Sequence, residues 1–417
     1  MFCNSLIKKV NGQVVDYFDP GYLFLLFTSL TFLPLSILII FSSESFFNSL
    51  NHWGAFDLNI FRKNIYAHLI LILSFSISYY FFTYRTHGKK FVFQKNEKIN
   101  IQIIVFIFIS LAIASIPFNL FNVRGFPRML MFLIDFMKEP VEIILIGILA
   151  SKFEKKSSSL IFIFLFSITI YFIPQLLMPN GDAVIINRGK ILSVMLVSTG
   201  FLNYYKWGGK FLTSKILFYG LLGGLLLIHG LFLLEEYIGG SELTMMSFIL
   251  FPALAFEPII FDNAATVINW IDNGEAQLRY GSTWLQALDG LYPFKVNFEP
   301  LEEWYCWTKN PSYAATGGRY NFSAVAEGYL NGKLLGVFIH GLIIGSIASF
   351  IRGMKYSNTI GQYRLIFYCP SILIVNVLNR KSLMGALGTI EFYLIGITMF
   401  VIIYSILNLK LSDSQVS

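Results

Sequence analysis

The sequence predicts an all-α polytopic membrane protein with about ten transmembrane helices. Of its 417 residues, 55% are hydrophobic and only 13% are charged. Soluble domains carry roughly 25% charged residues, so this chain lacks the charge that keeps a soluble surface solvated. Apolar runs of about 20 residues, the length that crosses a ~30 Å hydrocarbon core, recur along the chain. Together these features predict a membrane bundle.

Each predicted span is an apolar run bounded by polar residues. The ten spans cover residues 21–41, 65–84, 100–121, 129–151, 159–178, 190–205, 214–234, 331–351, 361–379 and 383–408. A further apolar stretch, 243–261, is ambiguous because Pro252, Glu257 and Pro258 interrupt it.

Basic loops give the expected orientation. Three loops, at 85–99, 152–158 and 206–215, are short and rich in lysine and arginine, which places them and the N-terminus in the cytoplasm. Segment 235–242 carries three glutamates and no basic residue, as expected of an outer loop.

The number of membrane crossings then decides how to interpret the ambiguous stretch 243–261. If it crossed the membrane, the basic loop 351–360 would lie outside. If it rests on or dips into the outer surface, that loop returns to the cytoplasm. We therefore expect an interfacial or re-entrant helix at 243–261, ten spans, and both termini in the cytoplasm.

Three regions follow from this topology. An N-terminal bundle of seven spans covers 1–234, a periplasmic segment covers 235–330, and a C-terminal bundle of three spans covers 331–417. The part at 262–330 is too aromatic for disorder, and so long a loop is usually functional. The alternative is a folded cap that merely covers the bundle. Its aromatic residues are Trp270, Trp284, Tyr292, Trp304, Tyr305, Trp307, Tyr313 and Tyr320.

Arginine is concentrated on the predicted outer side. Lysine suits a general cytoplasmic anchor, whereas the planar fork of arginine grips phosphate oxygens bidentately. Several of these arginines lie near outer ends of spans, the depth of a lipid pyrophosphate head group. The alternative is that they snorkel or pair with Asp135, Asp182 and Glu391. The seven outer arginines are Arg62, Arg124, Arg128, Arg188, Arg279, Arg319 and Arg380.

The cysteines, histidines and glycines show no pattern typical of a catalytic or metal site. The three cysteines are far apart in the sequence, and no histidine shares a local cluster with other metal ligands, so we expect no metal site. His340 is interpreted as a packing or hydrogen-bonded residue. The Gly-x-x-x-Gly at 341–345 predicts close helix packing. No nucleic-acid-binding module is visible.

A motif lies between Gly317 and Gly336, before the eighth span: Ser323, then Glu-x-Tyr at 327–329, then Asn-x-x-x-x-Gly at 331–336. It resembles the end of the large periplasmic loop in Wzy-type O-antigen and capsule repeat-unit polymerases. Two further segments are similar to that family, Asn187-Arg188-Gly189-Lys190 before the sixth span and Asn379-Arg380-Lys381-Ser382 between the last two.

The resemblance implies a GT-C-like bundle in the bacterial inner membrane. Such an enzyme moves a sugar chain from undecaprenyl pyrophosphate to a hydroxyl of a second lipid-linked oligosaccharide and needs no cofactor. Only Asp57 stands in the first outer loop, where metal-dependent membrane glycosyltransferases carry paired acidic residues, so a metal-free member is expected. A chain-length regulator and a flippase are the protein partners implied.

Site residues follow from that reaction. Arginines can stabilise the departing pyrophosphate, and a carboxylate can take the proton of the attacking hydroxyl. Glu327 is the expected base, with Asp289 and Glu302 as weaker candidates. The alternative is that Glu327 has only a structural role, in an ion pair with Arg319 or Lys333. The catalytic arginines expected are Arg188, Arg319 and Arg380, and the substrate-binding residues are Arg124, Arg128, Arg279, Asp289, Tyr320, Tyr329 and Asn331.

Two other functions remain open. An O-antigen ligase shares the multi-span plan and the large outer loop. A flippase or transporter of lipid-linked oligosaccharide is the other, although transporters are expected to place charges at the bilayer midplane and to show paired halves. Mid-span charges are few here and no internal repeat is visible.

Overall fold

The computed structural model describes most of the chain. The described residues are 18–41, 58–85, 100–121, 128–177, 188–207, 223, 230, 258–289, 299–316, 318, 320–356 and 377–414.

All regular structure in these ranges is helical, and none of them contains a strand. The helices are α2 (Pro20–Phe41), α4 (Leu58–Arg85), α5 (Ile101–Phe121), α6 (Arg128–Ala150), α7 (Lys156–Leu177), α8 (Arg188–Tyr205), α12 (Pro258–Asp272), α13 (Ser282–Asp289), α14 (Leu301–Lys309), α15 (Pro311–Ala315), α16 (Ala324–Tyr356) and α18 (Leu383–Ser414).

Eight of the ten predicted spans coincide with helices, namely α2, α4 to α8, α16 and α18. Most of predicted spans 214–234 and 361–379, and most of 243–261, lie outside the described residues. Within the described part, Leu58–Thr83, Ala324–Gly353 and Leu383–Leu409 are long and apolar enough to cross a membrane. The all-α membrane class is confirmed, while the count of ten spans and the outer cap stay predictions.

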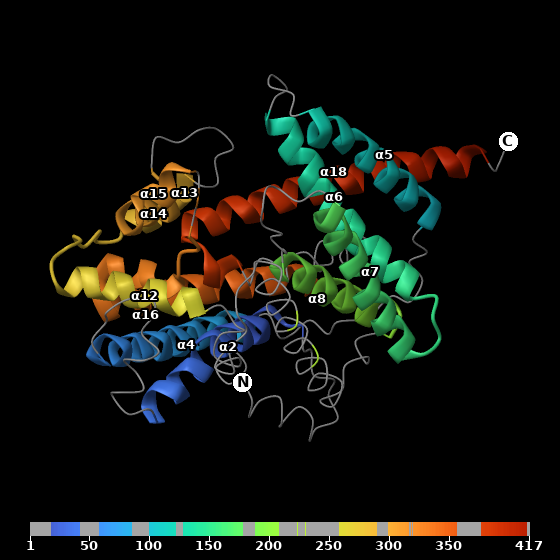
Figure 1. Ribbon diagram of the computed structural model, residues 1–417. Helices are drawn as coiled ribbons and strands as arrows, with labels where there is room; N and C mark the ends of the chain where they lie inside the picture. Colours follow the sequence, from blue (N-terminus) through green and yellow to red (C-terminus); the bar gives the residue numbers. More distant parts are fainter. Residues whose placement is uncertain are drawn as a thin grey trace.

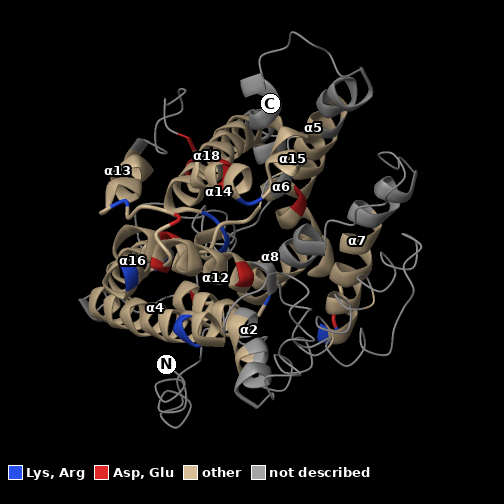
Figure 2. Ribbon diagram, turned by 60° about the vertical axis from the view of Figure 1, so that its left-hand side comes forward, with Lys and Arg blue, Asp and Glu red and all other residues tan. Residues whose placement is uncertain are grey.

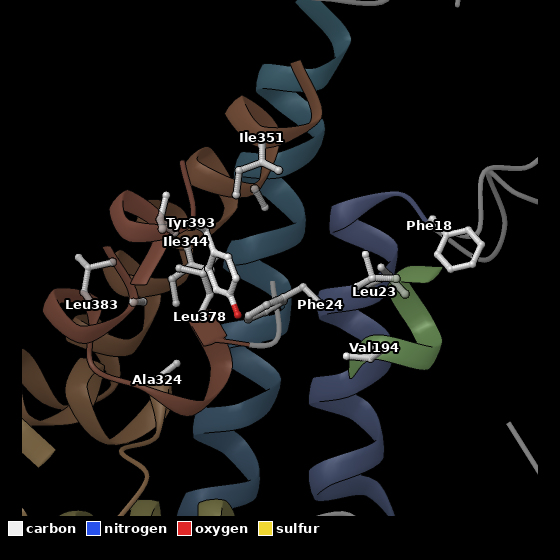
Figure 3. Close-up of a cluster of buried hydrophobic side chains, with 14 of the residues drawn as sticks. Phe18, Leu23, Phe24, Val194, Ala324, Ile344, Ile351, Leu378, Leu383 and Tyr393 are labelled. Carbon is white, nitrogen blue, oxygen red and sulfur yellow. The ribbon is translucent and has the colours of Figure 1, made fainter. Parts of the chain in front are cut away.

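The helices form two groups joined by α18 (Figure 1). In one group α16 packs along α4, with α2 and α12 beside them. In the other, α6 contacts α5, α7 and α8. Helix α18 begins beside α13 and then runs along α6 and α5. One buried hydrophobic cluster links the groups, and Figure 3 shows side chains from α2, α8, α16 and α18 in it.

Two glycines let α16 lie directly on α4. A Cβ added at Gly341 would lie 1.9 Å from Ser74 Oγ, and one added at Gly345 would lie 2.6 Å from the carbonyl oxygen of Phe75. The close approach also lets Ser78 donate its hydroxyl to the carbonyl of Leu342 at 2.7 Å. The close packing predicted from Gly-x-x-x-Gly is confirmed.

A polar cluster joins three helix ends at one side of the bundle. Asp19 begins α2 by accepting a hydrogen bond from the backbone N–H of Gly21 at 3.1 Å, as an N-cap residue does. Its carboxylate also accepts the hydroxyl of Tyr79 near the end of α4 and lies 2.8 Å from Nε of Arg352 near the end of α16. The start of α2 and the ends of α4 and α16 therefore share one side.

A second polar cluster marks the opposite side. Asp272 at the end of α12 pairs with Lys63 near the start of α4. It lies 3.5 Å from Lys333 in α16 and accepts the hydroxyl of Tyr329 at 2.9 Å. Helices α4 and α16 therefore run parallel.

The segment predicted to lie outside contains a small aromatic core. Tyr305 is fully buried, with its ring centre 5.5 Å from that of Trp270 and 5.6 Å from that of Phe322. Trp307 and Tyr313 stay exposed. Helices α12 to α15 lie in a stretch where the sequence shows no clear periodicity, so they were not predicted.

Substituting Gly345 by alanine should destabilise the α4–α16 pair. The new methyl group would overlap the backbone of Phe75, and such overpacking costs about 1–3 kcal/mol. Thermal unfolding of the purified protein in detergent should show a lower Tm. Gly353→Ala is the matched control, because a Cβ there meets nothing within 4 Å. Equal Tm values for the two variants would contradict the close packing.

Candidate active site

The family-like motif lies at a sharp bend in α16. Gly332 is extended with φ 177°, and Lys333 follows in the left-handed region with φ 52°. A Cβ on Gly336 would then lie 2.1 Å from the carbonyl oxygen of Gly328, and one on Gly328 only 2.7 Å from Cα of Val337. In a straight helix residues eight apart are separated by ~12 Å. The chain therefore folds back on itself, and the two facing glycines make this possible.

Glu327, in the first arm of the bent helix, connects three helices. Its side chain is fully buried. Oε1 accepts the hydroxyl of Thr283 in α13 at 2.9 Å, and Oε2 accepts the backbone N–H of Leu383, the first residue of α18, at 2.6 Å. A buried carboxylate is costly unless it is hydrogen-bonded, and here both oxygens are. Glu327 thus fixes α13 and α18 relative to α16.

Asn331 closes the end of the same arm. Its Nδ2 donates to the carbonyl of Glu327 at 2.8 Å and to Thr283 Oγ1 at 2.6 Å. Its Oδ1 accepts the backbone N–H of Gly281 at 2.9 Å. The backbone N–H of Arg279 donates to the carbonyl of Leu330 at 2.9 Å. The segment before α13 therefore caps the first arm of α16 and holds Thr283 over Glu327.

A second carboxylate holds the start of α18. Ser382 is its N-cap, because its hydroxyl oxygen accepts the backbone N–H of Gly385 at 3.1 Å. Glu302 in α14 accepts both the backbone N–H and the hydroxyl of Ser382 at 2.8 Å. Glu302 and Glu327 therefore both lie at the positive end of the α18 dipole, where negative charge is favoured.

Tyr329 and Lys333 both point to Asp272. Partial burial alone would raise the pKa of the Asp272 carboxyl. Hydrogen bonds from Lys63 and Tyr329 and the charges of both lysines outweigh this effect, so the pKa of Asp272 lies below its usual range. Lys333 thus pairs with Asp272, so the alternative ion pair of Glu327 with Lys333 is wrong.

Lys309 and two tyrosines form a separate polar cluster in the segment predicted to lie outside. Lys309 lies 2.7 Å from Asp262 and 5.5 Å from the ring centres of Tyr305 and Tyr320. Burial lowers the pKa of Lys309, but the interactions with Tyr305 and Asp262 raise it by more. The pKa of Lys309 therefore lies above its usual value. The predicted substrate residue Tyr320 is thus packed against Tyr305, with ring centres 5.9 Å apart.

Two of the arginines predicted for the site have described side chains. Arg279 is exposed, with its guanidinium 5.7 Å from the ring centre of Trp304 in α14. Arg380 is half-buried. It comes two residues before Ser382, whose hydroxyl donates to Glu302 of α14. Both therefore lie close to α14. Figure 2 shows charged residues gathered where α12, α13, α14 and α16 meet.

The other predicted site residues are only partly described. Arg124 and Arg319 lie outside the described residues. Arg128 and Arg188 begin α6 and α8, and Asp289 ends α13, but only their backbones are described. Their convergence with Glu327 stays a prediction.

Sequence reasoning missed the residues that surround Glu327. Thr283 carries no local signal, because its contact with Glu327 spans 44 positions. Ser382, a serine just before an apolar run, does have the signature of an N-cap, which could have identified the start of α18. His340 was predicted to be hydrogen-bonded, and its Nδ1 lies 3.0 Å from Nε1 of Trp284.

Residues 274–411 match the family model described as O-antigen polysaccharide polymerase Wzy. This part of the chain is therefore similar to Wzy-type O-antigen polymerases. The match covers α13 to α16 and most of α18, and with them Glu327 and Asn331. No curated protein and no solved structure matches the chain.

The match of residues 274–411 supports a general activity. The family polymerises O-antigen repeat units from lipid-linked oligosaccharides in lipopolysaccharide biosynthesis. The match and the apolar helices together support a multi-pass inner-membrane protein. The match favours polymerase over ligase and transporter. Among the described residues, no three His, Cys, Asp or Glu side chains are grouped as a metal site would require.

The Asp272 cluster predicts an acid-sensitive contribution to stability. The pKa of the Asp272 carboxyl is lower in the folded protein than in the unfolded chain, where it is about 3.9. The charged carboxyl therefore stabilises the fold fully above about pH 3.9, and this stabilisation is lost as the pH falls through the folded-state pKa. The Tm difference between the wild type and Asp272→Asn should therefore be constant from pH 7 to 5 and shrink towards pH 3. The exposed Glu275→Gln is the control. A difference that does not change with pH would contradict the charged cluster.

Proposed function

We propose that this Wzy-type protein polymerises undecaprenyl-pyrophosphate-linked repeat units into O-antigen or capsular polysaccharide by metal-independent glycosyl transfer on the periplasmic face. The observation that carries the proposal is the buried carboxylate of Glu327, held between α13 and the start of α18 within the family-matched region. A carboxylate hydrogen-bonded in this way is fixed in position, as a general base has to be.

The reaction needs one bond exchange and one proton transfer. The bond between the donor sugar and its pyrophosphate breaks, and the acceptor hydroxyl of the second repeat unit forms the new glycosidic bond. The hydroxyl proton passes to Glu327, and the bonding electrons leave with the pyrophosphate. Because the pyrophosphate is already a good leaving group, the protein has only to stabilise its charge.

In this proposal Oε1 of Glu327 is the oxygen that receives the proton. Each carboxylate oxygen has two lone pairs, and Oε1 uses one for Thr283. Because Glu327 is fully buried, the acceptor hydroxyl has to take the place of the Thr283 hydroxyl. A shift of α13 away from α16 would provide this access. Oε2 keeps its bond to Leu383 and holds the carboxylate in place.

Arginines would bind the pyrophosphate. Arg380 precedes the start of α18, which Glu302 of α14 holds, and Arg279 lies beside Trp304 of the same helix. We propose that Arg188 and Arg319 complete the catalytic set, and that Arg124, Arg128, Asp289 and Tyr320 contact the rest of the substrate. Tyr329 and Asn331 serve the site by fixing the arm that carries Glu327.

The polar clusters at the two sides of the bundle support the proposed topology. Asp19 at the start of α2 contacts Arg352 near the end of α16, so these ends share a side. Helix α16 therefore starts on the other side, which requires an odd number of crossings before it. The seven predicted spans of 1–234 supply that number, so 243–261 would not cross. We propose that the side of Asp19 is cytoplasmic, together with both termini.

Cysteine labelling tests this orientation. Glu275→Cys, at the exposed turn after α12, should react with a membrane-impermeant maleimide in spheroplasts. Glu154→Cys, in the exposed turn between α6 and α7, should react only after lysis. Cys3 and Cys369 are first replaced by serine, and buried Cys306 is left. Labelling of position 154 alone in spheroplasts would overturn the orientation.

Glu327→Gln should insert and fold but make no long chains. The glutamine amide keeps an oxygen that can accept the N–H of Leu383. The substitution removes the general base, and this loss typically lowers the rate about 10²–10⁴-fold. The measurement is the polysaccharide ladder of a deletion strain complemented with each variant. Arg380→Ala and Arg319→Ala should show the same loss, and the exposed Glu299→Gln should not.

The deletion strain itself separates the candidate functions. Loss of a polymerase leaves lipopolysaccharide with a single repeat unit, whereas loss of a ligase or flippase leaves bare core. Bare core in the deletion strain would refute the polymerase, and normal ladders with Glu327→Gln would remove Glu327 from the mechanism.

A further inference from the structure

Behind Glu327 lies a histidine that the proposed reaction has not used. His340 belongs to the second arm of α16 and is 1% exposed. Its Nε2 lies 4.0 Å from Oε2 of Glu327, and its Nδ1 lies 3.0 Å from the indole Nε1 of Trp284 in α13. The three side chains therefore form a continuous row from α13 to the proposed base.

The tautomer of His340 follows from this row. An indole N–H can only donate a hydrogen bond, so Nδ1 of His340 must accept and carries no proton. A neutral imidazole has one N–H, which is then on Nε2. His340 therefore directs its only N–H at the carboxylate of Glu327. The contact joins a neutral donor to a carboxylate and is not an ion pair.

The bend in α16 produces this arrangement. A Cβ added at Gly328, next to Glu327, would lie 3.2 Å from Cβ of His340, so a larger residue there would push the two arms apart. The distance of 4.0 Å is longer than a hydrogen bond. Catalytic hydrogen bonds are often long without substrate and shorten in the reactive complex. A small rotation of the carboxylate away from Thr283 would bring Oε2 to His340.

We propose that His340 is a positioning residue for the glycosyl transfer. Its Nε2–H holds Oε2 of Glu327 while Oε1 takes the proton of the acceptor hydroxyl, and Trp284 keeps the imidazole in the required tautomer. The proposal rests on the proposed function, because it assigns His340 to the orientation of that base. Thr283 and Trp284 are adjacent in α13, so one short helix holds both the base and its positioning residue.

Two substitutions of His340 separate this role from packing. Glutamine places an amide N–H near the position of Nε2, towards Glu327. Asparagine places its amide near Nδ1, where it can still accept from Trp284 but cannot reach Glu327. Trp284→Phe keeps an aromatic ring and removes the indole donor. The assay uses the full-length protein in detergent with synthetic undecaprenyl-pyrophosphate repeat units, and measures kcat and KM.

The proposal predicts an order of activities. His340→Asn should lower kcat about tenfold or more with little change in KM, the loss expected when a hydrogen bond to a charged group is removed. His340→Gln should stay within about threefold of the wild type, and Trp284→Phe should fall between them. His68→Asn, a buried histidine of α4 stacked between Phe32 and Phe261, is the control and should keep kcat per folded molecule.

The outcomes distinguish this inference from the proposed function. If His340→Asn is as active as His340→Gln, the positioning role is overturned. If the wild type polymerises, Glu327→Gln is inactive and His340→Asn runs at the wild-type rate, only the inference about His340 fails. If the wild type does not polymerise the lipid-linked units, the proposed function fails and the inference fails with it.

Discussion

The arrangement of the site depends on one buried carboxylate. Glu327 is fully buried, and its two oxygens bind two elements that are distant in sequence, α13 through Thr283 and the start of α18 through Leu383. Removing a carboxylate from water costs several kcal/mol unless hydrogen bonds compensate it. The N-terminus of α18 supplies part of this compensation through its exposed N–H groups and its dipole. The carboxylate therefore places α18, and the arginine before it, relative to α16.

The motif residues around Glu327 act together because α16 bends. Gly328 and Gly336 let the two arms approach, and Asn331 closes the first arm against the segment before α13. Tyr329 ties the same arm to Asp272. Glu327 and Asn331 share Thr283 as a partner, and the residues of the motif together fix the position of one carboxylate. A site built on packed helices in this way is held more precisely than one carried by a free loop.

The sequence predicted what local pattern can determine. Long apolar runs predicted eight helices that the structure contains, and Gly-x-x-x-Gly predicted the close packing of α16 on α4. The motif located Glu327 and Asn331. The partners of these residues could not be predicted, because Thr283 and Leu383 meet Glu327 across 44 and 56 positions. The aromatic residues of the segment predicted to lie outside indicated a folded region, and there Tyr305 packs against Trp270 and Phe322.

The most direct test of the account is a cryo-EM structure of the Glu327→Gln variant with a lipid-linked repeat unit bound as acceptor. The acceptor hydroxyl should lie within about 2.6–3.2 Å of the side chain at position 327, in place of the Thr283 hydroxyl, with pyrophosphate oxygens against Arg380. A bound repeat unit that leaves Thr283 on that side chain and places its hydroxyl elsewhere would contradict it.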